Sequence, residues 1–410
     1  MTTITGTKGG SWLLEAGDPA TVLTPERLSD EHRLIARTVQ EFAAKEVVPS
    51  IDRLEQKDWG VARHLLRRAG ELGLLGVDAP EEFGGVGLDK AAALVVSCNM
   101  AGSASFNAAF GAQSNLVIVP LLLFGTPEQK NRYLPTLISG EMVGAYALSE
   151  SASGSDALGA NARAAKLPDG SFALTGEKMW TTNGVQADWM CLLANTGDGA
   201  PHNNKSLICV PMKAKGVTVA KKIDKIGMMS SDTAQIFLDD VRVPQRNRIG
   251  DEGMGFTYQM LQFQEERLWA AAHSITSMDR SIEQTIDYAR QRFAFGKAVL
   301  DNQYVHFRLA ELKTEVEALR SLTYRAVEEY AAGKDVTELA SMAKLKCGRL
   351  LREVSDGCLQ FWGGMGYTWE NPLGRAYRDG RLASIGGGTD EIMLGIICKH
   401  MGILPGQSNR

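Results

Sequence analysis

The spacing of hydrophobic residues divides the chain into three regions. From Pro25 to about Tyr146, apolar residues recur at the three- and four-residue steps typical of amphipathic helices. Between about 147 and 250 the apolar runs are short, rich in β-branched residues and separated by turn residues, which is typical of β-strands. After Gly253 the helical spacing returns and is kept. The predicted organisation is a tail without an assigned role at residues 1–25, an N-terminal α-helical domain at 26–147, a middle β domain at 148–250 and a C-terminal helical bundle at 251–405.

Capping residues predict where individual helices begin. Ser29 is the predicted N-cap of a helix that ends near Pro49, and Thr126 is a second N-cap with Pro127 at the first helical position. In the C-terminal region one helix carries a long apolar stripe, which indicates packing in a bundle. The stripe consists of Leu268, Ala271, Ile275, Met278, Ile282 and Ile286.

Composition and charge narrow the classes of function. The chain has 410 residues, 44% of them hydrophobic, and a formal net charge of −4. So mild a balance gives no electrostatic reason to expect nucleic acid or an anionic membrane as a partner. No uninterrupted apolar run reaches the roughly 18 residues of a membrane span, and the N-terminus lacks the pattern of a secretory signal. We therefore expect a soluble, cytoplasmic protein.

The cysteines and histidines do not indicate a metal site. Six cysteines are scattered without a Cys-x-x-Cys pair, and six histidines show no metal-ligand spacing. The cysteines are expected to be reduced and mostly part of the core.

Two polar motifs near the middle of the chain carry candidate chemistry. In YALSESASGSD, residues 146–156, four serines and a glycine supply hydroxyl and amide donors suited to a phosphate or the edge of a heterocycle, although a Ser/Gly linker would have the same composition. In GEKMWTTNG, residues 176–184, Trp180 offers a flat ring and Thr182 a hydroxyl beside an Asn183–Gly184 hairpin signal. By itself, Trp180 is more typical of a core residue than of a cofactor contact.

Taken together, the two motifs resemble those of the acyl-CoA dehydrogenase family. The resemblance continues in YARQRFAFGKAVLDNQ (288–303), QFWGGMGYTWENPLGRAYRD (360–379) and IGGGTDEIM (385–393), and it covers roughly residues 26–404. It is nearest to the long-chain, isovaleryl and citronellyl-CoA members. It implies an α+β multidomain fold with a helical domain, a β-barrel-like domain and a four-helix bundle, and it implies FAD as cofactor and an acyl-CoA as substrate.

The resemblance also implies roles for individual residues. Leu148 and Ser149 match contacts of the flavin pyrimidine ring, and Ser155 matches a phosphate and pantetheine contact. Trp180 is expected to stack beside the isoalloxazine and Thr182 to bind near flavin N5. The remaining implied cofactor contacts, several of them from the neighbouring subunit, are Arg292, Phe295, Gln303, Gln360, Gly364, Thr389 and Glu391.

The family's reaction requires a base for the α-proton of the thioester, while the β-hydrogen leaves as hydride. Many members carry this base as a glutamate at the position that is Gly387 here. Isovaleryl and long-chain members instead carry it on a helix, just before an arginine, and Glu266 followed by Arg267 matches that pattern. The alternatives are that Glu266 is an ordinary solvated glutamate or that Glu265, about 100° away on the helix, takes its place. Glu391 is a third candidate base, but it belongs to a predicted helix start.

Helical spacing puts Glu266 on the face opposite the apolar stripe, together with Ala270, His273 and Ser277. Gly387 keeps an amide that can donate to the thioester oxygen, and Gly386 opens space beside the substrate's α and β carbons. We therefore expect tolerance for a medium, long or 3-methyl-branched chain. The three glycines are also compatible with a plain left-handed turn.

Other roles of the same scaffold stay open at this stage. The main hypothesis is a dehydrogenase that passes electrons to an electron-transfer flavoprotein and forms a homodimer or homotetramer. The alternatives are an acyl-CoA oxidase, a flavin monooxygenase, or a non-catalytic acyl-CoA-binding protein, the last suggested by Gly387.

Overall fold

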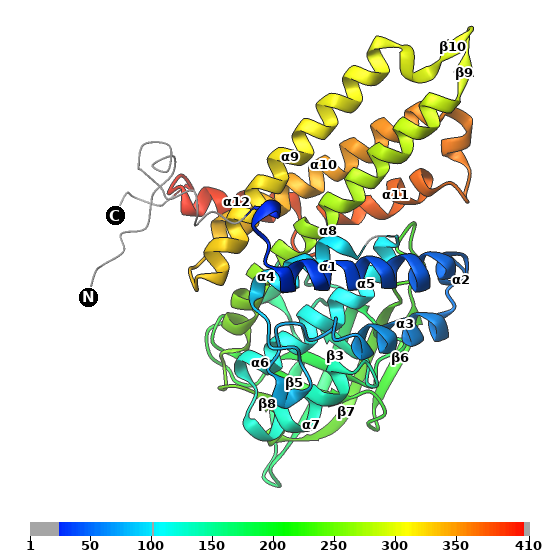
Figure 1. Cartoon of the computed structure of the whole chain (residues 1–410). Coiled ribbons are helices and arrows are strands. Elements are labelled where there is room, and N and C mark those ends of the chain that lie inside the picture. Colours follow the sequence, from blue (N-terminus) through cyan, green and yellow to red (C-terminus); the bar gives the residue numbers. More distant parts are fainter. Residues whose placement is uncertain (1–23, 101, 406–410) are drawn as a thin grey trace.

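The computed structural model describes residues 24–100 and 102–405 and confirms the order of a helical domain, a sheet and a second helical domain (Figure 1). Nearly all of the predicted tail lies outside the described residues. The N-terminal helices surround one apolar core. They are α1 (Asp30–Phe42), α2 (Ile51–Glu55), α3 (Trp59–Glu71), α4 (Lys90–Asn99), α5 (Ala104–Gly111), α6 (Val119–Phe124) and α7 (Pro127–Ile138).

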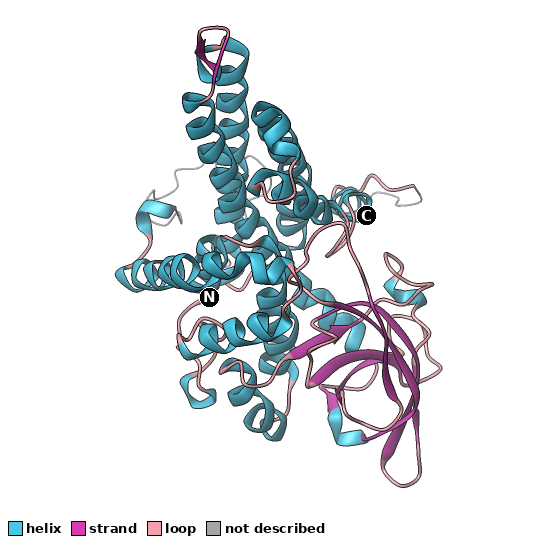
Figure 2. Cartoon of the chain, turned by 90° about the vertical axis from the view of Figure 1, so that its right-hand side faces the viewer, coloured by secondary structure: helices cyan, strands magenta, loops and turns pink. Residues whose placement is uncertain are grey.

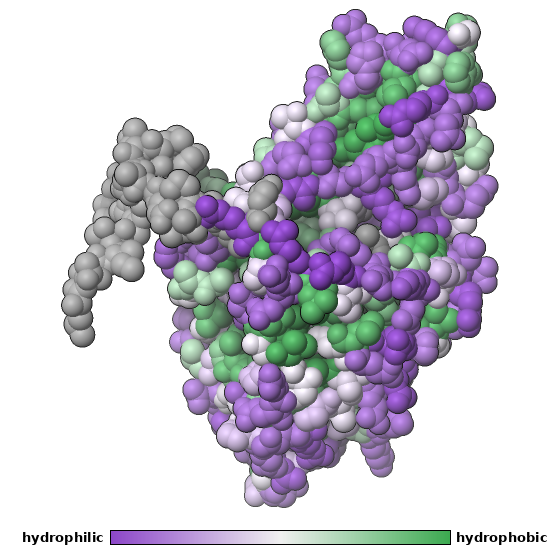
Figure 3. All heavy atoms as spheres, in the orientation of Figure 1, coloured by the Kyte–Doolittle hydropathy of each residue, from purple (hydrophilic) through white to green (hydrophobic). Residues whose placement is uncertain are grey.

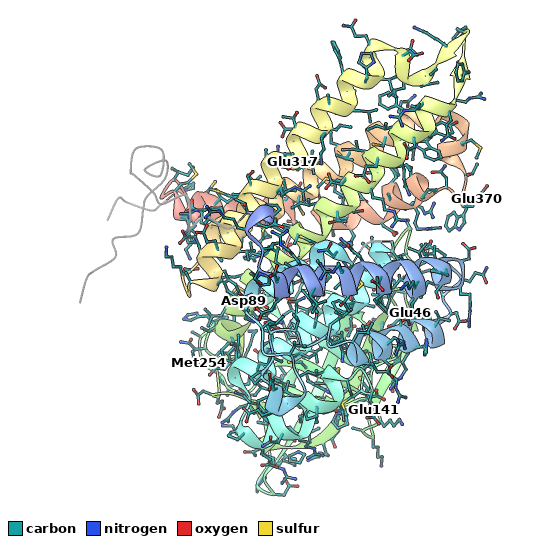
Figure 4. All side chains as sticks on the ribbon, viewed as in Figure 1. Glu46, Asp89, Glu141, Met254, Glu317 and Glu370 are labelled. Carbon is teal, nitrogen blue, oxygen red and sulfur yellow. The ribbon has the colours of Figure 1, made fainter. Side chains whose placement is uncertain are left out.

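Both predicted N-caps are confirmed. The Ser29 side chain accepts a hydrogen bond from the backbone N–H of His32, and the Thr126 side chain accepts one from Gln129. Asp89, labelled in Figure 4, caps α4 in the same way, and its Oδ1 lies 2.9 Å from Nε2 of His32. This contact ties α1 to α4, against which the C-terminal domain packs.

A helical run from Ala104 to Phe124 passes through the centre of this domain. It joins α5 and α6 through a π-helical stretch, Ala112–Ile118, which widens the helix locally. Within the described part of the chain it is the one helix long and apolar enough to span a membrane, although it contains polar residues. Because 72% of its most apolar window is buried in the protein, it has the surroundings of a core helix.

The middle domain is an eight-stranded sheet with the order β6-β7-β3-β2-β4-β5-β8, with β1 paired to β4 (Figure 2). The order begins with β6 and ends with β8, so the described strands form a curled, open sheet (Figure 2), which is the β-barrel-like middle domain that the resemblance implied. The sheet also begins earlier than predicted, because Gly144 pairs with Trp189. The strands are β1 (Gly144–Ala147), β2 (Arg163–Lys166), β3 (Ser171–Thr182), β4 (Trp189–Asn195), β5 (Lys205–Pro211), β6 (Val217–Lys222), β7 (Thr233–Pro244) and β8 (Arg248–Ile249).

The hairpin predicted at Asn183–Gly184 is wrong. The turn forms, with a φ of 64° at Asn183, but the strands before and after it, β3 and β4, are not neighbours in the sheet. The buried Asn183 side chain instead donates a hydrogen bond of 3.0 Å to the carbonyl of Ala109. The asparagine therefore joins the sheet to α5.

The C-terminal domain is a bundle whose longest member, α8, has 37 residues. The predicted stripe from Ala271 to Ile282 is buried against α9 and α10, while Leu268 packs with α4 of the first domain. A short hairpin projects from the far end of the bundle, away from the sheet (Figures 1 and 2). The elements are α8 (Gly255–Gln291), β9 (Phe293–Ala294), β10 (Lys297–Ala298), α9 (Gln303–Ala331), α10 (Thr337–Trp362), α11 (Pro372–Gly380) and α12 (Asp390–His400).

Candidate active site

A cavity of about 240 Å³ lies where the two helical domains meet. The helical run Ala104–Phe124 and α8 form facing walls, and α10, α11, the turn before α12, Thr182 and Met228 contribute the rest of the lining. About half of the residues along these two walls have small side chains, which leaves room between the helices. They include Ala104, Ala108, Ala112, Ala270, Ser274 and Ser277.

Glu266 brings a carboxylate into this cavity. Ala270, His273 and Ser277 line the same cavity, as the helical spacing predicted. Oε2 of Glu266 is inaccessible to solvent and has no hydrogen-bond partner. Burial raises the pKa of Glu266, while the positive charges of Arg267 and Lys344 act in the opposite direction. A partly desolvated carboxylate without a bound partner is suited to accept a proton.

The glycine turn lies directly opposite this carboxylate. A Cβ atom placed on Gly387 would be 3.3 Å from Oε1 of Glu266, which is tighter than ordinary contact. Gly387 and Gly388 have φ values of 66° and 99°, so the left-handed turn that the sequence left open is present as well. At Gly386 a Cβ would meet Leu382 at an ordinary 3.5 Å, so the chain itself does not demand glycine there. Gly386 and Gly387 both line the cavity.

Glu265 has a different environment, which argues against a role as base. Its two carboxylate oxygens accept hydrogen bonds from Lys90 at 3.1 and 3.0 Å, and the Tyr330 hydroxyl donates to Oε2 at 2.8 Å. Lys90 also donates to Asp78. Glu265 therefore belongs to a buried ion network between α4, α8 and α9.

Two basic side chains accompany Glu266. Arg267, a predicted substrate contact, lines the cavity, and its Nε is buried without a partner. Lys344, from α10, also lines the cavity and donates a hydrogen bond to the carbonyl of Gly388. Lys344 was not among the residues predicted from the sequence. The signal was available, since Lys344 interrupts an apolar helix face that includes Ala340 and Cys347.

His273 contributes an uncharged ring to the cavity wall. Both of its nitrogens are buried without a hydrogen-bond partner, and the ring stacks on Trp269 with 6.0 Å between centroids. Burial lowers the pKa of His273 to about 4. The ring is therefore neutral at physiological pH and adds no charge beside Glu266.

Leu148 and Ser149, which are predicted to contact the flavin, lie in the loop after β1. Hydrogen bonds from residues of β3 hold this loop in place. The buried Lys178 ammonium donates to the Leu148 carbonyl at 2.9 Å and to Oε1 of Glu150 at 2.8 Å. The N–H of Met179 donates to the Ser149 carbonyl at 2.8 Å. The loop is therefore held against β3, which also carries Trp180 and Thr182.

Trp180 is held in an unusual conformation for a tryptophan. Its φ is 61°, in the left-handed region, at an irregularity in the pairing of β3 with β7. The side chain is 59% exposed, so Trp180 is not the core residue that its type alone suggested. Thr182, two residues on, lines the cavity. Ser155 is exposed in the loop between β1 and β2.

The remaining predicted cofactor residues are not brought to Trp180 within one chain. Arg292, Phe295 and Gln303 are exposed at the hairpin end of the bundle, far from the sheet in Figure 1. Gln360 and Gly364 are exposed at the end of α10. Thr389 caps α12 by accepting a hydrogen bond from Ile392, and Glu391 is exposed in the first turn.

Models of the acyl-CoA dehydrogenase family match nearly the whole described chain. The N-terminal domain matches residues 29–141, the middle domain 145–241 and the C-terminal domain 253–402. The chain belongs to the acyl-CoA dehydrogenase family. This membership places it among the oxidoreductases.

Curated relatives cover both short- and long-chain acyl-CoA dehydrogenases. The long-chain specific mitochondrial enzyme of Sus scrofa is 36% identical over 376 residues, with 91% of this chain and 87% of the relative covered. The short-chain specific mitochondrial enzyme of Rattus norvegicus is 34% identical over 382 residues, covering 93% and 92%.

Solved structures agree with the family assignment. An acyl-CoA dehydrogenase from Bacillus anthracis, solved in complex with FAD, superposes with a TM-score of 0.90 at 34% identity, with 98% of this chain and 74% of the other covered. Butyryl-CoA dehydrogenase from Megasphaera elsdenii gives a TM-score of 0.87 at 30% identity, covering 92% and 99%.

Proposed function

We propose that this chain is an FAD-dependent acyl-CoA dehydrogenase in which Glu266 removes the α-proton of the acyl thioester. The observation that carries this role is the unpartnered carboxylate of Glu266 in the interdomain cavity, facing Gly387. The cavity wall also includes Thr182 from the sheet, so the base and a predicted flavin contact share one space.

The residues on the sheet side suit a flavin. Trp180 presents an exposed ring, and the Leu148–Ser149 loop offers backbone and hydroxyl groups. When bound, FAD would accept the β-hydrogen as hydride. The chain's own contribution is to bind the acyl group between α5 and α8, to exclude water and to take up the α-proton on Glu266.

The turn at Gly387 suits the second requirement of the reaction. Negative charge develops on the thioester oxygen as the α-proton leaves, and a fixed N–H group stabilises it. We find no hydrogen bond from the Gly387 amide to another described residue. This amide is therefore the group that we assign to the thioester oxygen.

The substrate is proposed to be a medium or long acyl-CoA, with tolerance for a 3-methyl branch. The small residues on the facing walls of α5 and α8 support this proposal, because they widen the cavity along its length and not only beside Glu266. Gly386 extends the space near Glu266. The proposed electron acceptor is an electron-transfer flavoprotein.

A homodimer or homotetramer would complete the cofactor site. Arg292, Phe295 and Gln303 are exposed at the hairpin end, and neighbouring aromatic side chains are exposed as well. Figure 3 shows apolar surface on this bundle. The exposed aromatic residues at this end include Phe293, Tyr304, Phe307 and Tyr367.

The decisive experiment is Glu266→Gln, with Glu283→Gln as a matched control. Glu283 is exposed on the same helix and lies outside the cavity lining. Turnover of straight and 3-methyl acyl-CoAs should fall about a thousandfold in Glu266→Gln with FAD still bound, and stay unchanged in the control. Near-normal turnover in Glu266→Gln would exclude this base. Peroxide formation in air at the rate of flavin reduction would indicate an oxidase, and a protein that binds no FAD would indicate a non-catalytic role.

A further inference from the structure

Lys344 is a buried lysine on an otherwise apolar helix face. Its side chain belongs to the middle of α10, between Ala340 and Cys347, and is 2% exposed. A lysine is almost never buried so completely unless its charge has a partner or a purpose. Burial lowers the pKa of Lys344, against the effects of Cys347, Asp390 and Glu266, which favour the charged form, and Arg267 disfavours it further.

The contacts of Lys344 converge on the glycine turn. Its ammonium donates a hydrogen bond to the Gly388 carbonyl, and its Cε lies 3.9 Å from where a Cβ on Gly387 would stand. That same point is 3.3 Å from Oε1 of Glu266. Lys344 from α10 and Glu266 from α8 therefore both approach the position that a side chain on Gly387 would occupy.

Lys344 and Glu266 do not form an ion pair, although they are close. Among the described residues, the Lys344 ammonium donates to the Gly388 carbonyl and not to Glu266, whose Oε2 has no hydrogen-bond partner. A direct ion pair would hold the carboxylate in place and reduce its basicity. A cation that is bound to the Gly388 carbonyl, near the carboxylate but not in contact with it, favours the ionised form of Glu266 and leaves Oε2 without a partner.

We propose that Lys344 is a positioning residue, which fixes the Gly387–Gly388 turn opposite Glu266 and supplies a positive charge beside that carboxylate without binding it. This inference rests on the proposed role of Glu266 as base. The other charge that acts on Glu266 is that of Arg267, on its own helix. Asp379 of α11 and the neutral His273 of α8 line the same cavity, and the buried Tyr146 phenol of β1 has no hydrogen-bond partner. Lys344 is thus a cation that acts on Glu266 from a different helix, α10.

Three substitutions separate the charge of Lys344 from its hydrogen bond. Lys344→Met removes both, Lys344→Gln keeps a donor without the charge, and Lys344→Arg keeps the charge. The control is Lys346→Met, on the same helix, because Lys346 is paired with Glu315 at the surface.

The first readout is the pH dependence of kcat/KM for an acyl-CoA. In Lys344→Met and Lys344→Gln the acid limb should move up by about one pH unit, because the carboxylate loses a nearby positive charge. In Lys344→Arg and Lys346→Met it should stay in place. If all three Lys344 variants lose activity equally with an unmoved acid limb, Lys344 serves only to build the turn and the inference is wrong. If Lys344→Met does not fold, the contrast between Lys344→Gln and Lys344→Arg decides.

Thermal unfolding across pH gives a second readout that needs no activity. The pKa of Glu266 is raised in the folded state, so the stability of the protein falls as pH rises through that pKa. Loss of the Lys344 charge raises the pKa of Glu266 further, so the total loss of stability at high pH becomes larger. Lys344→Met should therefore lose more Tm at pH 8 than at pH 5, and adding Glu266→Gln should remove the difference. An equal loss at both pH values would overturn the charge effect. Wild-type protein with no acyl-CoA-dependent flavin reduction would refute the proposed function instead.

Discussion

A side chain on Gly387 and the carboxylate of Glu266 would compete for one place. A Cβ on Gly387 would lie 3.3 Å from Oε1 of Glu266, and the φ of 66° places Gly387 in the left-handed region. Two different segments of the chain, the turn before α12 and the middle of α8, thus point at the same position in the cavity. Because only one of them can supply a carboxylate there without displacing the other, glycine in the turn and glutamate on α8 are consistent with each other.

The first prediction concerns Gly387→Ala. The left-handed conformation costs a non-glycine residue about 1–2 kcal/mol, and the added methyl group would press against Glu266. We expect a loss of unfolding free energy of that size, measured by urea denaturation, and at least a tenfold loss of turnover, since a carboxylate that is displaced from its substrate position is a poor base.

Gly395→Ala is the matched control for this substitution. Gly395 lies inside α12, and no atom lies within 4 Å of where its Cβ would stand. Alanine is favoured over glycine in a helix interior by roughly 1 kcal/mol, so this variant should be as stable as wild type or more stable. If Gly387→Ala behaves like Gly395→Ala, the turn does not restrict Glu266.

The main features of the fold and the face of α8 that holds Glu266 could be predicted from periodicity. Caps at Ser29 and Thr126 are local signals, and they were correct because the hydrogen bonds that they make are local. The role of Asn183 could not be predicted, because its partner, the Ala109 carbonyl, comes from a distant helix. Lys344 was missed for the same reason: its contact with Gly388 exists only once α10 and the turn before α12 pack together.

The second prediction concerns the buried ion pair of Lys178 and Glu150. Lys178→Met leaves Glu150 buried without its cation, which typically costs about 3–5 kcal/mol. It also removes the hydrogen bond to the Leu148 carbonyl, so the adjoining loop loses its anchor. We expect both a lower urea midpoint and weaker retention of FAD on dilution.

The exposed pair of Arg242 and Asp240 provides the comparison. Both side chains are more than half exposed, at 51% and 60%, so Arg242→Met should change stability by less than about 1 kcal/mol. A small effect of Lys178→Met, similar to that of Arg242→Met, would show that the Leu148 loop does not depend on the buried pair.

The third prediction concerns acid stability and His273. Its pKa in the folded protein is about 4, below the ordinary value of 6.5, so the unfolded chain binds the proton more readily. The neutral, buried His273 ring therefore stabilises the folded protein above pH 6.5, and this stabilisation is lost as the pH falls towards 4. At about 1.4 kcal/mol per pKa unit, the loss is at most about 3.5 kcal/mol.

The measurement is the unfolding free energy of wild type and His273→Leu between pH 7 and 4. The leucine variant should lose less stability over this range. Asp379 acts in the opposite direction, because burial raises its pKa to about 6, and it is present in both proteins, so the difference between the two curves isolates His273. Parallel curves would mean that the ring takes up a proton in the folded state as easily as in the unfolded chain.

The last prediction separates folding from cofactor binding at Trp180. Trp180 has a φ of 61°, a conformation that destabilises the folded state of a non-glycine residue. Because its side chain is 59% exposed, burial of the indole offsets little of this cost. Asparagine adopts the left-handed region more readily, so Trp180→Asn should leave the FAD-free protein as stable as wild type or more stable, by up to about 1 kcal/mol. The same change should weaken FAD binding, because the ring that is proposed to stack beside the isoalloxazine is lost.

Phe237→Asn provides the contrast, since Phe237 is partly exposed on β7 and has no positive φ, and this variant should lose stability without an effect on FAD. A destabilised FAD-free Trp180→Asn protein that binds FAD normally would show that the tryptophan serves the fold and not the cofactor.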